Sequence, residues 1–453
     1  MIRNLLIATC LAGASASALA QQQPPAPATT PDASPVRKEG NMPVPARNPS
    51  ATYLMQQYGI GEADAEERVR LQLDIVELAR QMEGLGDAAF TDIWVQHEPV
   101  YKIVIGFADA KDRTALLQQI DPKLRRHVLV RQTPRNAQEV ESGLASIIAA
   151  LRTSGISYTG GYDTPSGQFV VVVESADDLQ RIRTMIPPSL RGDTRLIIGS
   201  VPRNSQSGGT PTGVQAGDYF AAGWPINRDG DGARNCTFGY RVTYGSPARK
   251  GVVTAGHCRS AGVWLWADDN WVWFDTFDPV YHRLDANYDY MVLDATGLNP
   301  ERDVAYGVYY EDLNSIPEFP SYGYFDVVGT MARSTQKIGY IMWKSGYRTG
   351  ITCGEITSNN ALRNGTGSGW VSVSNTKQAD LSAGGDSGGP WFMYPGSKTD
   401  IYATGVHSGD AVSKSCVGTG WACTSQYMPI DKINDHVSSV TVVVKKPIVV
   451  SGS

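Results

Sequence analysis

Three features are scarce in this sequence: long apolar runs, clusters of basic residues and, before residue 201, cysteines. After the first twenty residues no apolar run approaches the roughly 20 residues that a membrane-spanning helix needs. The 40 basic residues are outnumbered by 45 acidic ones and form no basic stripe, which disfavours a nucleic-acid-binding surface. We therefore expect no membrane span and no nucleic-acid partner.

The first twenty residues have the layout of a secretory signal peptide. A basic residue stands near the start, an apolar stretch covers residues 5–13, and a small-residue cleavage pattern ends at Ala20. A lipid anchor on Cys10 is the alternative, although Thr9 is a poor residue directly before a lipidated cysteine. We expect these twenty residues to be removed and the protein to be secreted, either to the periplasm or outside the cell.

Five cysteines remain after such a cleavage, and all of them lie in the second half of the chain. They are Cys236, Cys258, Cys353, Cys416 and Cys423. Export permits disulfides, and an odd number leaves one cysteine without a partner in the same chain. Because residues 21–200 contain no cysteine, we expect only the second half to depend on such cross-links.

The first half of the chain divides by composition. A length of 453 residues suggests two or three domains. Residues 21–50 are rich in Gln, Pro, Ala and Thr without apolar periodicity, which predicts a disordered leader. Residues 51–200 combine helical and strand-like patterns, which predicts a compact α+β domain. The expected helices are residues 63–81 and 137–151, and the expected strands are residues 101–107, 128–131 and 169–173.

Two segments of this α+β region, residues 109–127 and 176–190, share one layout and predict a duplicated small unit. The pattern changes after it. Residues 201–217 form a polar Gly-, Ser- and Pro-rich linker, in which we expect a processing site. Residues 218–440 contain short aromatic and β-branched runs between Gly, Asn and Asp turns, which predicts an all-β sandwich or barrel. Residues 441–453 remain as a C-terminal tail.

Three short strings in the second half carry residues suited to nucleophilic catalysis. They are VTAGHC around His257, YDYMVL around Asp289 and GDSGGP around Ser387. A serine hydroxyl is a poor nucleophile at neutral pH, so it needs an imidazole to take its proton and a carboxylate to orient that imidazole. Glycines beside the serine allow the sharp turn that aims backbone N–H groups at a developing oxyanion. Each string alone is more often an ordinary turn or a packed strand, but their joint occurrence in one exported domain predicts a catalytic triad.

The strings resemble those of the chymotrypsin family of serine proteases, and the layout behind a long prosegment resembles its bacterial alpha-lytic protease and streptogrisin branch. The resemblance covers roughly residues 218–440. It implies two perpendicular six-stranded antiparallel β-barrels with the triad in the cleft between them. It also implies that His257 acts as general base and then acid, that Asp289 orients it, and that the N–H groups of Gly385 and Ser387 form the oxyanion hole.

The sequence departs from the family pattern beside Asp289. Met291 replaces the small residue usually found two positions after the aspartate. Asp285 and Asp294 are therefore the alternatives for the orienting carboxylate.

The resemblance also implies how the cysteines pair. Cys236 and Cys258 match the family's disulfide beside the catalytic histidine. Cys353 resembles one half of a second bridge, but Trp343 occupies the usual partner position, so we expect Cys353 to be unpaired. Cys416 is then expected to pair locally with Cys423.

The resemblance places the substrate-binding residues in two stretches of the chain. They are Leu381, Ser382, His407, Ser408, Gly409 and Asp410. Leu381 stands six residues before the nucleophile, where an aspartate would select Lys or Arg. Preference for basic residues by that route is therefore not expected, although Asp410 could supply a negative charge from the opposite wall. The backbone of residues 408–410 is expected to pair with the substrate.

His407 points toward another preference, because the segment around it is similar to one in glutamate-specific members of the family. A protonated His407 could bind an acidic side chain, and a satisfied wall histidine is the alternative. Asp410 would repel such a side chain. No glutamate occurs between Glu174 and Glu301, so a strictly Glu-specific enzyme could not cut its own linker. We expect a preference for small or apolar residues before the scissile bond, with acidic residues second.

The α+β region resembles alpha-lytic-type prosegments over residues 158–173, which implies an inhibitor and folding assistant. A permanent binding module is the alternative. We expect a monomeric secreted serine endopeptidase, made as a proenzyme, which cleaves proteins or peptides through an acyl-enzyme and needs no cofactor or metal. A catalytically silent protease-like protein that binds peptides or surfaces is the competing hypothesis.

Overall fold

The computed structural model describes most of the chain from residue 48 onward. The described residues are 48–202, 220–227, 234–259, 263–266, 273–296, 304–311, 322–363, 367–375, 381–396, 399–411 and 423–445. All of them belong to one compact unit that begins at Met42. Within these residues no helix is both long and apolar enough to cross a bilayer. The expected signal peptide and most of the expected linker, from residue 203 onward, lie outside the described residues.

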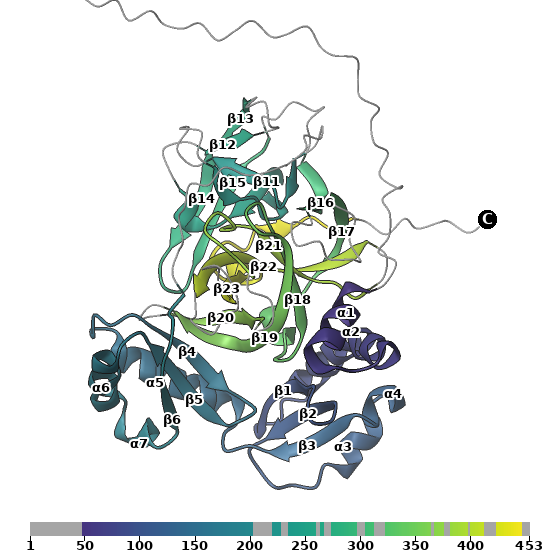
Figure 1. Ribbon diagram of the computed structural model, residues 1–453, viewed down its shortest axis with the longest axis vertical. Coiled ribbons are helices and arrows are strands. Elements are labelled where there is room, and N and C mark those ends of the chain that lie inside the picture. Colours follow the sequence, from purple (N-terminus) through teal and green to yellow (C-terminus); the bar gives the residue numbers. More distant parts are fainter. Residues whose placement is uncertain are drawn as a thin grey trace, which may run out of the picture. The chain divides into compact units, whose positions relative to one another are not determined.

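The segment of residues 48–200 forms helices and short strands (Figure 1). Its elements are α1 (Pro49–Tyr58), α2 (Glu62–Gly84), β1 (Phe90–Gln96), β2 (Lys102–Phe107), α3 (Thr114–Gln119), α4 (Pro122–Arg125), β3 (Val128–Gln132), α5 (Ala137–Leu151), β4 (Tyr158–Asp163), β5 (Gln168–Val173), α6 (Ala176–Met185), α7 (Pro188–Arg191) and β6 (Thr194–Ile198). The helical and strand patterns of the sequence therefore identified α2, α5, β2, β3 and β5, and missed β1 and β4.

Local capping explains where two of these helices begin. The side chain of Asn48 accepts a hydrogen bond from the amide of Ser50, so α1 begins at Pro49, inside the last residues of the segment expected to be disordered. Asn136 and Glu139 form a reciprocal capping box at the start of α5, which matches its expected range.

The two halves of the α+β region have the same topology. In each half a long helix precedes two antiparallel strands, then two short helices, then a strand parallel to the second one. The first half contains β1, β2 and β3, and the second contains β4, β5 and β6. This agrees with the duplicated unit predicted from residues 109–127 and 176–190.

The β region, which comprises the described residues after position 218, forms mainly strands. The strands of its first part are β7 (Phe220–Ala222), β8 (Pro225–Asn227), β9 (Arg234–Thr237), β10 (Arg241–Tyr244), β11 (Arg249–Thr254), β12 (Val263–Trp266), β13 (Trp273–Phe277), β14 (Pro279–Leu284) and β15 (Asp289–Asp294). Those of its second part are β16 (Val304–Glu311), β17 (Tyr322–Thr330), β18 (Ile341–Gly346), β19 (Gly350–Arg363), β20 (Gly367–Ser374), β21 (Pro390–Met393), β22 (Asp400–Ala411), β23 (Thr424–Pro429) and β24 (Thr441–Val442). The short helices η1 (Gly256–Cys258), η3 (Arg333–Thr335) and α8 (Lys432–His436) join them.

Six strands of the second part close into a barrel. The antiparallel pairs run from β19 to β18, β21, β22, β23 and β20, and β20 pairs with β19 again. In the first part, β8, β9, β12 and β13 form one sheet, and β10, β11, β14, β15 and β24 form another. Their apolar faces share one core, which includes Trp224, Phe238, Val252 and Met291. The expected fold class, a double β-barrel behind an α+β region, is thus confirmed.

The C-terminal boundary differs from the expected one. Thr441 and Val442, assigned to the tail by composition, form β24 and pair with Thr243 and Val242 of β10. A strand at the edge of a sheet satisfies its backbone groups by adding to the ladder. The first residues of the expected tail therefore belong to the first part of the β region.

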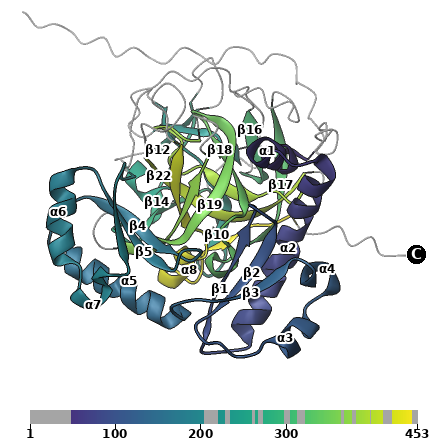
Figure 2. The ribbon, with the colours of Figure 1, turned by 60° about the horizontal axis from the view of Figure 1, so that its bottom comes forward.

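Two strand edges join the α+β region to the closed barrel. β4 pairs antiparallel with the end of β19, with Arg363 opposite Thr159, and the Thr159 hydroxyl donates to the carbonyl of Leu362 at 2.9 Å. Figure 2 shows β4 and β5 beside β19. In the first half of the α+β region, the amide of Val95 in β1 donates a hydrogen bond to the carbonyl of Ile338 at 2.9 Å. Each half of the duplicated region therefore contacts the same barrel through its first strand.

Candidate active site

His257 lies in η1, directly after the buried end of β11. The chain turns there at Gly256, where a Cβ atom would lie 2.5 Å from the carbonyl oxygen of Arg283 and 2.9 Å from the amide of Tyr290. Only glycine fits so close to another backbone. Gly256 therefore allows the turn that carries His257 to pack against β14 and β15.

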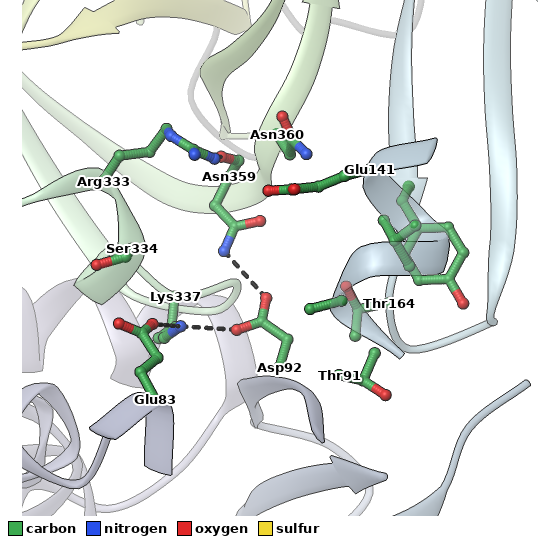
Figure 3. A pocket seen from close by; sticks show the side chains of 13 residues that line it. Glu83, Thr91, Asp92, Glu141, Thr164, Arg333, Ser334, Lys337, Asn359 and Asn360 are labelled. Carbon is green, nitrogen blue, oxygen red and sulfur yellow. Dashed lines mark hydrogen bonds and ion pairs between the residues drawn. The ribbon is translucent and has the colours of Figure 1, made fainter. Parts of the chain in front are cut away.

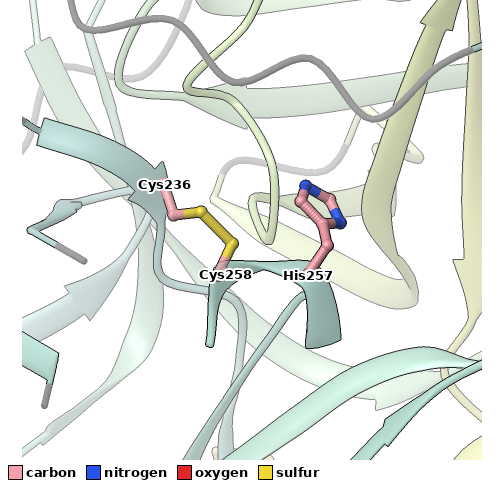
Figure 4. Close-up of side chains that lie close together, drawn as sticks. All are labelled: Cys236, His257 and Cys258. Atoms are coloured by element: carbon pink, nitrogen blue, oxygen red, sulfur yellow. A yellow bond between two sulfur atoms is a disulfide. The ribbon is translucent and has the colours of Figure 1, made fainter. Parts of the chain in front are cut away.

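A disulfide holds the other side of this turn. Cys258 is bonded to Cys236 of β9, as the family resemblance implied (Figure 4). Closing a loop of 22 residues in this way stabilises the fold by about 3 kcal/mol on the chain-entropy estimate. The two sulfurs and a ring nitrogen of His257 lie within 4.8 Å of one another, but sulfurs bonded to each other are not thiolate ligands, so this cluster is not a metal site.

Asp289 is the first residue of β15 and is buried beneath His257. Its Oδ1 accepts a hydrogen bond from the backbone amide of His257 at 2.8 Å, and its Oδ2 lies 2.7 Å from the imidazole Nδ1. The two alternatives lie elsewhere: Asp285 pairs with Arg283 at 2.7 Å, and Asp294 pairs with Arg249. Of the three candidate carboxylates, only that of Asp289 contacts the imidazole.

The charge state of Asp289 follows from its surroundings. Burial alone raises the pKa of a carboxyl, but contact with His257, the nearby charge of Arg363 and a hydrogen bond from Ser408 outweigh it and hold the pKa of Asp289 well below its usual range. An ionised carboxylate can only accept hydrogen bonds. The proton between the two groups is therefore on Nδ1 of His257, and Nε2 is left to accept.

Ser387 brings the nucleophilic group to that nitrogen. Its Oγ lies 2.8 Å from Nε2 of His257, and the residue is 1% exposed. Ser387 stands in the turn before β21 of the closed barrel, whereas His257 and Asp289 belong to the first part of the β region. The three side chains meet where the two parts of the β region join.

The turn around Ser387 contains the backbone amides of Gly385 and Ser387. Within the described residues, neither the N–H of Gly385 nor that of Ser387 donates to a hydrogen-bond partner. Gly385 has a φ of 112°, and a Cβ atom there would lie 2.7 Å from the ring of Tyr347. Glycine at this position therefore permits the turn that presents both amides.

Asp386, between these two residues, is fixed by an ion pair that sequence reasoning missed. Its Oδ2 lies 2.9 Å from Nζ of Lys344 in β18, and neither side chain is exposed. Thr349 adds two hydrogen bonds and the amides of Arg348 and Ala383 add one each. The conformation of the serine turn is thus held by a fully buried cation on β18, the strand that pairs with β21.

The residues expected to bind substrate lie on β22 and in the segment before Ser387. Leu381 is buried in the apolar core, and Ser382 donates a hydrogen bond to Asp410. His407 is fully buried, with Nδ1 accepting from the indole of Trp391 at 3.2 Å and Nε2 lying 2.8 Å from Oδ1 of Asp410. The carboxylate of Asp410 therefore lies against the imidazole of His407.

Ser408 and Gly409 follow His407 at an irregularity of the sheet. His407 pairs with Tyr427 of β23, and Gly409 pairs with the adjacent residue Gln426. Ser408 is therefore an extra residue in a β-bulge. A bulge turns a side chain away from the regular alternation. The Ser408 hydroxyl consequently reaches Oδ2 of Asp289, to which it donates a hydrogen bond.

Two further cysteines, Cys353 and Cys423, lie within the described residues. Cys353 is unpaired and buried, as predicted, and faces Trp343 across β18 and β19. Cys423 is disulfide-bonded. Cys416, its predicted partner, lies outside the described residues, so that pairing stays a prediction.

A small cavity of about 150 Å³ lies between the α+β region and the closed barrel (Figure 3). Lys337 of the barrel reaches into the contact and lies 2.7 Å from Asp92 and 3.3 Å from Glu83, while Asn359 donates to Asp92 at 3.1 Å. None of the triad residues lines it. The cavity belongs to the contact between the two regions rather than to the candidate active site.

Comparison with solved structures shows that this chain is similar to several serine proteases. A glutamic-acid-specific serine protease, described as using a histidine triad in substrate binding, is 25% identical, with 49% of this chain and all of that chain covered, at a TM-score of 0.34. The Nocardiopsis protease is 21% identical. The match covers 49% of this chain and 98% of that chain, at a TM-score of 0.34. Thermobifida fusca protease A is 22% identical. The match covers 50% of this chain and 100% of that chain, at a TM-score of 0.34.

These similarities concern half of the chain and have low scores, so the case for an activity rests on the site itself. No family model matches the sequence, and no characterised protein matches it by sequence. The described strands themselves form one closed six-stranded barrel and two further sheets that share one apolar core.

Proposed function

We propose that this protein is a secreted serine endopeptidase, synthesised as a proenzyme, with Ser387 as its nucleophile. The single observation that carries the proposal is the continuous chain of contacts from Asp289 to Nδ1 of His257, at 2.7 Å, and from Nε2 to Ser387 Oγ, at 2.8 Å. Asp289 orients the ring and stabilises its charged form, while Nε2 accepts the proton that Ser387 must lose.

The reaction follows from these contacts. Ser387 Oγ attacks the carbonyl carbon of the scissile bond as its proton passes to His257, and the carbonyl oxygen becomes an oxyanion. The N–H groups of Gly385 and Ser387, which have no acceptor within the described residues, donate to it. His257 then protonates the leaving amine, so the bond breaks and an acyl-enzyme remains. Water, activated by the same imidazole, hydrolyses the ester and returns the proton to Ser387.

Two proposals concern the specificity and the state of the enzyme. We propose a preference for small or apolar residues before the scissile bond, because Asp410 lies 2.8 Å from His407 and would compete with an acidic side chain for the imidazole. We propose that the α+β region is an inhibitory prosegment, because β4 extends the sheet of the closed barrel while Ser387 and His257 are only 1% and 7% exposed in the full chain. Cleavage of a peptide library by the processed enzyme tests the preference.

The activity itself is tested with a fluorophosphonate probe, which reacts with an activated serine. We expect the processed wild-type protein to be labelled and the Ser387→Ala variant to remain unlabelled and uncut. A folded, processed wild-type protein that takes up no probe would contradict the proposal and favour a silent, peptide-binding protein. If wild type and Ser387→Ala both accumulate at full length in the medium, the region before residue 200 is a permanent module.

A further inference from the structure

Arg363 is a buried cation beside the candidate triad, and the reaction described above does not use it. It is the last residue of β19 and is 5% exposed. Its guanidinium lies 4.4 Å from the ring centre of Trp370, which supports it from one side. Its Nη1 lies 3.9 Å from Oδ2 of Asp289. A buried charge is costly unless it is paired. The carboxylate of Asp289 supplies a partner charge for the buried guanidinium.

The guanidinium holds the hydroxyl that contacts Asp289. Nη1 of Arg363 donates to Oγ of Ser408, and Nη2 donates to the backbone carbonyl of Ser408 at 3.0 Å. A guanidinium can only donate. The hydroxyl proton of Ser408 must therefore point elsewhere, and it points to Oδ2 of Asp289. Arg363 thus determines the direction of the hydrogen bond that the triad carboxylate receives.

The same cation changes the charge that His257 experiences. Among the described residues, the charged groups that act on Arg363 are Asp289 of β15 and Asp410 of β22, which also lies against His407. Burial disfavours the charged form of Arg363, and the two carboxylates favour it. In a low-dielectric site a positive charge near Asp289 offsets part of the attraction between its carboxylate and the imidazolium form of His257.

We propose that Arg363 is a positioning residue of the triad, which orients the Ser408 hydroxyl toward Asp289 and limits the stabilisation of protonated His257. This inference rests on the proposed serine endopeptidase activity. It makes Arg363 act through Ser408 and Asp289, without contact to the substrate.

The test compares wild type with Arg363→Gln and Arg363→Lys, each expressed as the full chain and processed. For Arg363→Gln we expect kcat to fall about tenfold with KM within about twofold, since positioning affects the transition state more than binding. We expect the acidic limb of the kcat/KM profile to move to higher pH by roughly half a unit, because protonated His257 is no longer opposed by the cation. Arg363→Lys keeps the charge, so its limb should stay near that of wild type while kcat recovers only in part.

Lys432→Gln serves as the matched control. Its ammonium also lies over the Trp370 ring, at 5.4 Å, but within the described residues it contacts neither Ser408 nor Asp289. We expect its kcat and pH profile to match those of wild type. Titration with the fluorophosphonate probe gives the concentration of active sites, so a loss of folded enzyme is not mistaken for a lower kcat.

Two outcomes separate this inference from the proposed function. If wild type takes up no probe, the proposed activity fails. If wild type is active and Arg363→Gln retains both its kcat and its acidic limb, the inference about Arg363 is overturned. Should Arg363→Gln not fold, a double-mutant cycle between Arg363→Lys and Ser408→Ala replaces it. Non-additive effects on kcat support action through Ser408, and additive effects contradict it.

Discussion

The ammonium of Lys344 lies 2.9 Å from Oδ2 of Asp386, and both side chains are completely buried. Lys344 also donates to Oγ1 of Thr349 at 2.7 Å, and Thr349 donates to the same carboxylate at 2.7 Å. Asp386 lies between Gly385 and Ser387. The ion pair therefore connects the interior of the closed barrel to the turn that carries the proposed nucleophile.

Replacing Lys344 with Met should leave Asp386 buried without its cation. We expect the free energy of unfolding to fall by about 3 to 5 kcal/mol, because the cost of removing one partner exceeds the net contribution of the pair. Urea denaturation monitored by tryptophan fluorescence measures this. The double variant Lys344→Met, Asp386→Asn should recover part of the stability. Equal stability of the single variant and wild type would show that the pair has no structural role.

Asp289→Asn should lower kcat by about 10⁴-fold, because an amide can hold the imidazole in the wrong tautomer and cannot stabilise its charged form. Steady-state kinetics on a chromogenic peptide ester measures the change. Asp285→Asn and Asp294→Asn are the controls, since those side chains pair with Arg283 and Arg249 on the surface. A large loss of kcat in either control, with Asp289→Asn active, would refute the assignment of the triad carboxylate.

The contact between α1 and the closed barrel contains a pH-dependent group. Tyr58 donates to Glu355 at 2.6 Å, and Tyr53 lies 3.4 Å from the same carboxyl. Burial raises the pKa of Glu355 from 4.5 to about 7, with Glu98 adding to the rise and the two tyrosines opposing it. Because the pKa is higher in the folded proenzyme, the folded state binds the proton more tightly and should lose stability as the pH rises from about 4.5 to 7.

The measurement for Glu355 uses the uncleaved Ser387→Ala proenzyme at pH 5 and pH 8. We expect its thermal midpoint to be lower at pH 8, and we expect Glu355→Gln to reduce the difference between the two pH values, since an amide does not titrate. An identical difference in both proteins would mean that Glu355 does not contribute to the pH dependence.

Gly161 of β4 lies close to the barrel. Its φ is 154°, and a Cβ atom there would lie 2.7 Å from Oγ of Ser358 and 3.1 Å from the carbonyl oxygen of Asn360. Gly161→Val should therefore weaken the docking of the proposed prosegment and lower the yield of active secreted protease several-fold, if that region assists folding. The activity recovered from culture fluid measures the effect. Gly192→Val is the control, because nothing lies within 4 Å of its added Cβ; an equal loss in both variants would argue against a docking role.

Much of this molecule was predictable from local sequence patterns and from the family resemblance. Helices α2 and α5, the strands β2, β3 and β5, the Cys236–Cys258 disulfide and the unpaired Cys353 agree with the predictions. The secondary structure was predictable because helical periodicity and β-branched runs act within a few residues, and the cysteine pairing followed from the family resemblance. The first strands of both α+β halves were missed, since β1 and β4 lack a long apolar run.

The sequence by itself determined which residue types are available for catalysis: a histidine, an aspartate and a serine, each in a distinctive string. Only the tertiary structure decided which carboxylate meets His257, that Lys344 fixes Asp386, and that Arg363 reaches Ser408 beside Asp289. The physical reason is distance along the chain. These partners come from different strands, and the closure of the barrel and the bulge at Ser408 bring their side chains together.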